Sequence, residues 1–228
     1  MTHLGYVNAG SVLACATSLP TLSREDILSS VVYAQMSSST KYSALKDFSE
    51  WNERYAQVLR FCLYDFSIRL GDKESSSSSS QYVSIGGLAN AKLSSLLSPA
   101  EMAMLESLLR QASALGAESP ALKILTRHSV ELAQATLDGE MPVNRIRVHI
   151  GIVSEPATLK MVTINLATCD AIESNFFNQE FALGNIRGGV STQYFVARLD
   201  EDYAEFKRET VLRILEGRGD GEIARLPE

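Results

Sequence analysis

The sequence lacks the residues that most metal centres and disulfide frameworks require. Its three cysteines, Cys15, Cys62 and Cys169, lie far apart in a chain of 228 residues and form no C-x-x-C pair. An odd cysteine count without paired spacing is typical of a reducing compartment, so we expect a cytoplasmic protein in which each thiol acts as a small hydrophobe. The three histidines have no metal-ligand spacing. We therefore expect no metal and no cofactor.

Positive charge and long apolar runs are also scarce. The formal net charge is −6, and both halves of the chain are acidic, so we expect no nucleic-acid partner. No apolar run approaches the ~20 residues that a helix needs to cross a bilayer. The first residues carry no positively charged region ahead of their apolar segment, which favours an ordered strand or loop over a signal peptide.

Common catalytic motifs are missing as well. G-x-S-x-G and H-E-x-x-H do not occur, and the glycine-rich segment 184–191 has Val190 where a phosphate loop needs lysine. We interpret its glycines as turn residues that precede a strand. Cys169 could act as a nucleophile with His128 or His149 as its base, but nothing in the sequence brings these residues together. We expect no catalytic residue and keep a Cys-dependent enzyme as an alternative hypothesis.

The chain does contain a series of amphipathic helix patterns. They begin near Ser23, Asp47, Ser98 and Ser119, and a last one covers 201–216. The start at Ser98 is the clearest, because Pro99 suits the first helical position and Glu101 can close a capping box.

The second of these helices has an aromatic face. Trp51 and Tyr55 recur at helical spacing with Val58, Leu59 and Cys62. Aromatic side chains dominate core energetics, so we expect this face to be mainly core. As the alternative, the same face could form a contact surface, which makes Trp51 and Tyr55 candidate interaction residues.

Alternating apolar residues predict strands at 64–70 and 191–199, and an antiparallel hairpin at 145–168. With the loop at 154–158, one face of the hairpin carries the aliphatic residues Ile146, Val148, Ile150, Val162, Ile164 and Leu166. The other face carries Arg147, His149, Thr163 and Asn165. A slip by one residue would mix the two faces, so the register is strongly specified.

Three uses of this hairpin compete. In the favoured one, its aliphatic face packs on helices while Arg147 and His149 are solvated, as in most antiparallel sheets. A nucleic-acid ribbon would use Arg145, Arg147, His149 and Lys160, but the acidic chain and the scarcity of interleaved aromatics argue against it. In the third, the hairpin enters a membrane as part of an oligomeric barrel, since arms of ~9–11 residues suit a transmembrane strand.

Together the patterns predict an α+β fold in a single composite domain, 1–228. We expect an N-terminal helical layer to pack on a C-terminal antiparallel sheet that is closed by the last helix. Residues 1–71 should be mainly helical with one strand, and 82–142 helical. Residues 143–228 should form antiparallel strands and the C-terminal helix. Between them, 72–81 should form a flexible loop, because the six serines at 75–80 cannot bury enough apolar area to offset ordering.

Clear fold patterns beside missing catalytic motifs favour a non-enzymatic interaction or self-assembly protein. We expect a homo-oligomer, with a different protein as the alternative partner, and a sheet edge or the aromatic helix face as contact surface. The candidate interaction residues are Trp51, Tyr55, Arg145, Arg147 and His149. The second hypothesis is a membrane-active, toxin-like protein whose 145–168 hairpin inserts after oligomerisation.

Overall fold

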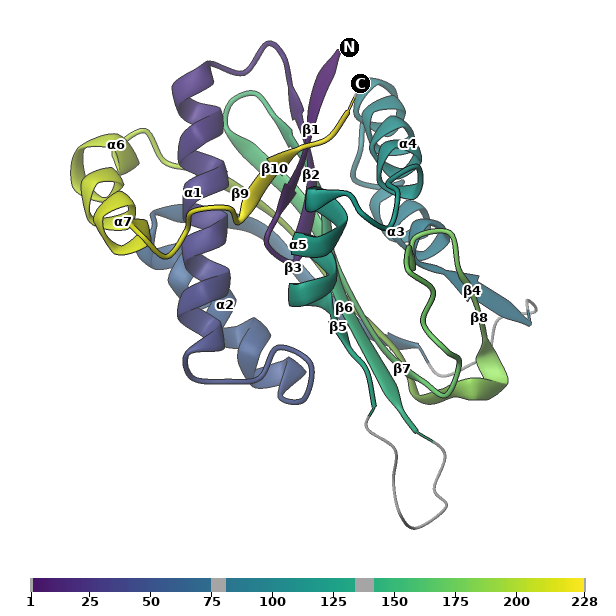
Figure 1. Cartoon of the computed structure of the whole chain (residues 1–228). Coiled ribbons are helices and arrows are strands. Elements are labelled where there is room, and N and C mark those ends of the chain that lie inside the picture. The colour runs from purple at the N-terminus through teal and green to yellow at the C-terminus, as the bar shows by residue number, and fades with distance from the viewer. Residues whose placement is uncertain (1, 75–80, 134–141, 228) are drawn as a thin grey trace.

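The computed structural model describes residues 2–74, 81–133 and 142–227. Its centre is an eight-stranded sheet of order β10-β1-β2-β6-β7-β9-β3, with β5 paired to β6 (Figure 1). These strands are β1 (His3–Asn8), β2 (Ser11–Ala16), β3 (Tyr64–Glu74), β5 (Val130–Glu131), β6 (Asn144–Ser154), β7 (Thr158–Thr168), β9 (Ile186–Leu199) and β10 (Ile223–Arg225). Strands β2 and β6 are parallel, and the other paired strands of this sheet are antiparallel. A second sheet pairs β4 (Tyr82–Ser84) with β8 (Glu180–Ala182).

Helices lie on both faces of the large sheet (Figure 1). One face is covered by α1 (Thr21–Ser39), α2 (Phe48–Phe61), α6 (Tyr203–Phe206) and α7 (Arg208–Leu215). The other is covered by α3 (Ile85–Leu93), α4 (Pro99–Ser113) and α5 (Pro120–Ser129). A short 3-10 helix, η1 (Leu183–Asn185), precedes β9. Each face has its own hydrophobic core.

The fold is therefore mixed α+β with a mostly antiparallel sheet, the class that the sequence predicts. Its layering differs from the expected single helical layer on a C-terminal sheet. The N-terminal strands β1 and β2 enter the sheet beside β6, and the helices that follow them are divided between the two faces. This parallel β2–β6 pairing joins residues more than a hundred positions apart, which local periodicity does not report.

The predicted side-chain cap is present at the start of α4. In α4 the Ser98 hydroxyl accepts from the backbone N–H of Glu101 at 3.4 Å, and the Glu101 carboxylate accepts from the backbone N–H of Ser98 at 2.9 Å. This is the predicted capping box. Helix α2 begins directly after Asp47 and α5 begins at Pro120, close to the predicted starts, but neither Asp47 nor Ser119 makes a side-chain capping hydrogen bond. Helix α1 begins at Thr21, directly after Pro20, and not at Ser23.

The last helix is not the single segment over 201–216 that the sequence predicts. It is split into α6 and α7 at Lys207, whose φ of −128° lies outside the helical range. The break aims Arg208 at α1, where its guanidinium donates to both oxygens of Asp26 at 2.6 and 2.5 Å. The break therefore coincides with a charged contact between α7 and α1 that the local helical pattern does not report.

Three of the predicted segments need correction. Residues 1–71 contain β1, β2 and most of β3, where one strand was predicted. Strand β3 continues to Glu74, so the serine-rich loop does not begin at 72, and residues 75–80 lie outside the described residues. The segment 82–142 contains the strands β4 and β5 besides its helices. Residues 134–141 also lie outside the described part of the chain.

The hairpin formed by β6 and β7 occupies the middle of the sheet. Each arm has 11 residues. The pairs Ile146–Leu166, Val148–Ile164 and Ile150–Val162 give the register that the sequence predicts. Because β2 and β9 flank the hairpin and helices lie on both faces, its two faces belong to two different cores.

Candidate functional site

The polar face of the β6–β7 hairpin is buried, and the prediction that it is solvated is wrong. Arg147 is 2% exposed and His149 is 0% exposed. The prediction assumed that one face of the sheet is wet, but α1 and α2 cover this face. Strands buried on both faces usually read as near-continuous apolar runs. The alternating sequence of β6 is therefore unusual for the place that the strand occupies.

Two aromatic residues of α2 form the cover over this polar face. The Arg147 guanidinium carbon lies 3.8 Å from the ring centroid of Trp51. The His149 ring stacks on Trp51 at 5.5 Å and on Tyr55 at 5.0 Å. Trp51 and Tyr55 are 0% and 2% exposed, so the expected use of this helix face as an external contact surface is wrong for the folded chain. Both residues are core, which was the favoured interpretation.

A short chain of hydrogen bonds fixes the imidazole of His149. Its Nε2 lies 2.6 Å from Nη1 of Arg147, and its Nδ1 lies 2.7 Å from Oγ1 of Thr163. Arginine has no acceptor, so Nε2 must accept, and the proton of a neutral ring is then on Nδ1, which donates to Thr163. We call Trp51, Tyr55, Arg147, His149 and Thr163 the buried polar cluster.

The charge in this cluster is not compensated by an acid. No carboxylate of the described residues lies within ion-pair distance of Arg147, and its Nε has no hydrogen-bond partner among them. Burial lowers the pKa of Arg147 to about 9. Burial, reinforced by the charge of Arg147, holds the pKa of His149 well below its usual range. A buried cation without an acid is costly, because the lost hydration is only partly replaced.

Two residues that the sequence analysis missed complete the surroundings. The backbone N–H of Gly10 donates to Oε1 of Gln35 at 3.0 Å, and its carbonyl accepts from the backbone N–H of His149 at 3.0 Å. A Cβ on Gly10 would lie 2.9 Å from Nη2 of Arg147 and 3.1 Å from Oε1 of Gln35, so a larger residue would require the Arg147 guanidinium to shift. Gln35 follows Val31 by four residues, which places an amide on the apolar face of α1 and was the available signal.

Arg145 does not belong to this cluster. Its side chain is partly exposed and lies 3.7 Å from a carboxylate oxygen of Glu131 in β5. The structure therefore brings together four of the five candidate interaction residues and leaves Arg145 at the end of the hairpin near the surface.

The cysteine–histidine pair considered in the sequence analysis is not formed in the structure. The ring nitrogens of His149 bond within the buried polar cluster, and Nε2 of His128 lies 2.6 Å from Oε2 of Glu222. Neither histidine forms a hydrogen bond with Cys169.

Gly188 and Gly189 have φ of +73° and +80° within β9, where the register with β7 shifts. These glycines allow a bulge inside the strand. The prediction that they form a turn before the strand is therefore wrong. No described residues form a cluster of three metal ligands.

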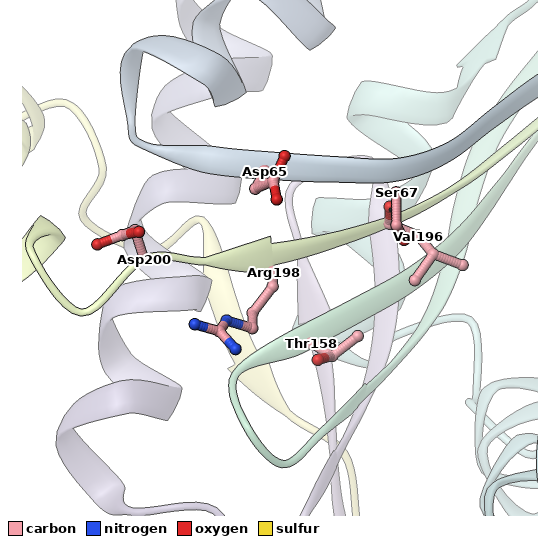
Figure 2. Close-up of a pocket in the computed structure, with 6 residues that line it drawn as sticks. All are labelled: Asp65, Ser67, Thr158, Val196, Arg198 and Asp200. Atoms are coloured by element: carbon pink, nitrogen blue, oxygen red, sulfur yellow. Dashed lines mark hydrogen bonds between the residues drawn. The ribbon is translucent and has the colours of Figure 1, made fainter.

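An open hollow of about 410 Å³ lies near the hairpin tip, where β7, β9 and β3 run side by side. It is lined by Asp65, Ser67, Thr158, Val196, Arg198 and Asp200 (Figure 2). Asp65, Arg198 and Thr158 form one row across the three strands. None of the candidate interaction residues lines this hollow.

In the described part of the chain, no helix combines the length and hydropathy needed to cross a bilayer.

No protein-family model and no curated protein sequence matches the chain. Among solved structures, a delta-endotoxin aligns with a TM-score of 0.47 and 10% identity, over 84% of this chain and 81% of its own. The activated Cyt2Ba monomer from Bacillus thuringiensis subsp. israelensis aligns with a TM-score of 0.46 and 6% identity, over 85% and 99%. The Evf virulence factor aligns with a TM-score of 0.34 and 9% identity, over 91% and 78%. Values this low establish neither a family nor a function.

Proposed function

We propose that this chain is a non-enzymatic, self-assembling, membrane-active protein. Its central hairpin, residues 145–168, leaves the sheet and enters a bilayer as part of an oligomer. Three features of the hairpin support this: the buried polar cluster, the length of its arms and the separation of its two faces.

The buried polar cluster is the observation that carries the proposal. In the folded chain Arg147 is 2% exposed with no carboxylate beside it among the described residues. A static core would be more stable with an apolar residue at this position, because an unpaired charge loses its hydration on burial. A second state in which this face meets water would remove that cost. Residues that violate the local packing rules in this way are expected at functional sites.

The dimensions and pattern of the hairpin match those of a transmembrane β-hairpin. Both arms have 11 residues, close to the ~9–11 that a tilted strand needs to cross the hydrocarbon core. The face that would meet lipid carries seven aliphatic residues, with Lys160 among them near the tip: Ile146, Val148, Ile150, Ile152, Val162, Ile164 and Leu166. The face that would line an aqueous lumen carries Arg147, His149, Thr163 and Asn165 in the half away from the tip, and Val153, Leu159 and Met161 near the tip. Transmembrane strands alternate in the manner of the half that contains Arg147.

Membrane entry by this hairpin requires assembly. A single hairpin would leave the N–H and C=O groups of its outer edges without partners in lipid, at a cost of several kcal/mol for each group. Hairpins from several copies remove these edges only when they close into a barrel. The proposal therefore includes the expected homo-oligomer, formed on the membrane.

A reversible lock on the hairpin tests the proposal. Cys15 in β2 and Val153 in β6 are paired across the two parallel strands, and both are fully buried. Neighbouring strands lie about 4.8 Å apart, within the Cα separation that a disulfide accepts. Val153→Cys therefore offers Cys15 a partner. We expect the oxidised variant to release no dye from liposomes, and reductant to restore release.

The matched control is the double variant Cys15→Ala with Val153→Cys, which has the new thiol but no partner for it. It should release dye with and without reductant. Full release by the oxidised, locked variant would contradict the proposal. So would a wild-type protein that releases no dye from neutral or anionic liposomes at neutral and mildly acidic pH.

A second candidate function is soluble self-assembly through a sheet edge. Strand β3 has 11 residues and pairs with β9 on one side only among the described strands. An edge of this length offers unpaired backbone groups to a second chain. In this case the protein would act in the cytoplasm without a membrane. Light scattering decides between the two candidates: a stable oligomer without lipid, together with no dye release, favours the edge.

A further inference from the structure

A single carboxylate ties both arms of the hairpin to the α3–α5 layer. Glu101 lies in the first turn of α4 and is 6% exposed. Its Oε1 accepts from the hydroxyl of Ser154, the last residue of β6, at 2.7 Å. Its Oε2 accepts from Nζ of Lys160, near the start of β7, at 2.8 Å. The same oxygen accepts from the backbone N–H and the hydroxyl of Ser98, each at 2.9 Å.

Lys160 has a second hydrogen-bond partner besides Glu101. Its side chain is 18% exposed, and Nζ also donates to the carbonyl of Leu96 at 3.1 Å. Although burial alone would favour the neutral acid, the hydrogen bonds from Lys160, Ser98 and Ser154 lower the pKa of Glu101 to about 2. The contact is therefore a charged pair at neutral pH, and it is largely withdrawn from water.

This contact differs in kind from the rest of the interface between the hairpin and α3–α5. The remaining buried contacts there are aliphatic, through residues such as Val162 and Ile164. Aliphatic contacts have little directional preference and scale with buried area. The capping box fixes the Glu101 carboxylate relative to the α4 axis, so its hydrogen bonds hold the tip of the hairpin in one position.

We propose that Glu101 is the latch that keeps the hairpin tip docked against α4, and that loss of its pairing with Lys160 and Ser154 is the step that frees the tip. This inference rests on the proposed function for its biological meaning. Its physical content, a local restraint on residues 154–160, is tested without a membrane.

Glu101→Gln is the most selective variant. Glutamine at this helix position also closes a capping box, so the start of α4 is kept while the charge that Lys160 needs is removed. Lys160→Met removes the other partner. The matched control is Lys123→Met, because Lys123 forms an exposed ion pair with Glu118, with 60% and 91% of the side chains exposed. Exposed ion pairs of this kind contribute little to the stability of a fold.

Hydrogen exchange of residues 150–162, measured in solution, reports the latch directly. Breaking a buried charged contact should raise the local opening rate by about tenfold or more. We expect this increase in Glu101→Gln and in Lys160→Met, and no further increase when the two changes are combined. Lys123→Met should exchange like the wild type. If Glu101→Gln does not fold, the comparison of Lys160→Met with Lys123→Met gives the same test.

Dye release from liposomes then separates the two proposals. Faster release by the latch variants supports both. Faster exchange without dye release by any variant, the wild type included, supports the latch and contradicts the membrane function. Exchange of 150–162 that is unchanged in both Glu101→Gln and Lys160→Met overturns the latch, whatever the liposomes show.

Discussion

The two faces of the central hairpin pack against the helices through different kinds of contact. Toward α3, α4 and α5 the contact is aliphatic, apart from the charged contact of Glu101 at the tip. Toward α1 and α2 the half of the hairpin that contains Arg147 and His149 meets stacked rings, and no carboxylate of the described residues compensates the guanidinium. One face stabilises the docked hairpin, and the other carries a cost.

This difference teaches where the fold is sensitive to conditions. Burial of aliphatic area contributes about 25 cal/mol per Å² and does not depend on pH. The free energy of burying a cation beside a neutral imidazole depends on the protonation of its neighbours and on the exclusion of water. Substitutions and pH changes should therefore affect the two faces differently, and their expected effects range from a large loss of stability to almost none.

A cavity in the aliphatic face should have the largest effect. Ile150 is fully buried in the core beneath α3–α5. Ile150→Ala should lower the free energy of unfolding by about 2–5 kcal/mol, because transfer free energy is lost and a cavity remains. Denaturant titration checks this. Ile150→Val is the graded control, at about 1 kcal/mol. A loss below that of the valine variant would mean that this face does not hold the hairpin.

Acid should act first on the polar face. His149 stays neutral in the fold, while the unfolded chain takes up a proton below about pH 6.5, the ordinary pKa of the group. The stability that the neutral ring provides is complete above that pH and is lost as the pH falls below it, by up to about 1.4 kcal/mol per pH unit. Denaturant titrations from neutral to mildly acidic pH measure this slope, and His149→Gln should flatten it. An unchanged slope would contradict the assignment.

The latch should respond to acid in a separate, lower window. The pKa of Glu101 is about 2, below its ordinary 4.5, through its bonds to Lys160, Ser98 and Ser154. A depressed pKa stabilises the fold fully above about 4.5, and that contribution is lost as the pH falls toward 2. Lys160 is the charged group that contacts Glu101. In the same denaturant titrations, His149→Gln should leave this second step in place, whereas Glu101→Gln should remove it.

Removal of the buried charge should stabilise the folded chain. Arg147→Gln keeps an N–H donor for Nε2 of His149 and removes the unpaired cation. We expect the free energy of unfolding at neutral pH to rise by about 1 kcal/mol, since buried ionic groups are often less favourable than neutral replacements. Under the proposed function, dye release should also slow. A variant that is less stable and more active would show that Arg147 supports the docked state and that its burial carries no cost.

The smallest effect is expected at Cys169. Its thiol is partly exposed, and its backbone N–H donates to the carbonyl of Asn185 at 2.9 Å. Cys169→Ala should leave stability within about 0.5 kcal/mol of the wild type and dye release unchanged. A selective loss of activity in this folded variant would favour the Cys-dependent enzyme hypothesis over a membrane-active protein.

Local features of this fold were predictable from sequence. The capping box at Ser98 joins residues three positions apart, and the hairpin register follows from a short loop between two adjacent strands whose apolar residues alternate. The burial of Arg147 and His149 was not predictable, because it depends on which helices cover a face after distant strands have paired. Helical spacing did predict that Trp51 and Tyr55 are core, but it did not indicate that a cation would lie against them.

The most direct test of the central claim compares two adjacent residues of β7 that face opposite sides. In a background without the three native cysteines, Thr163→Cys and Ile164→Cys each place one thiol on the hairpin, and both positions are buried in the folded chain. Their reaction with a membrane-impermeant maleimide is measured before and after liposomes are added. We predict that both thiols are protected in solution, and that on liposomes Thr163→Cys becomes reactive while Ile164→Cys stays protected. Equal behaviour of the two thiols on liposomes would contradict insertion of this hairpin with one face in lipid and one in water.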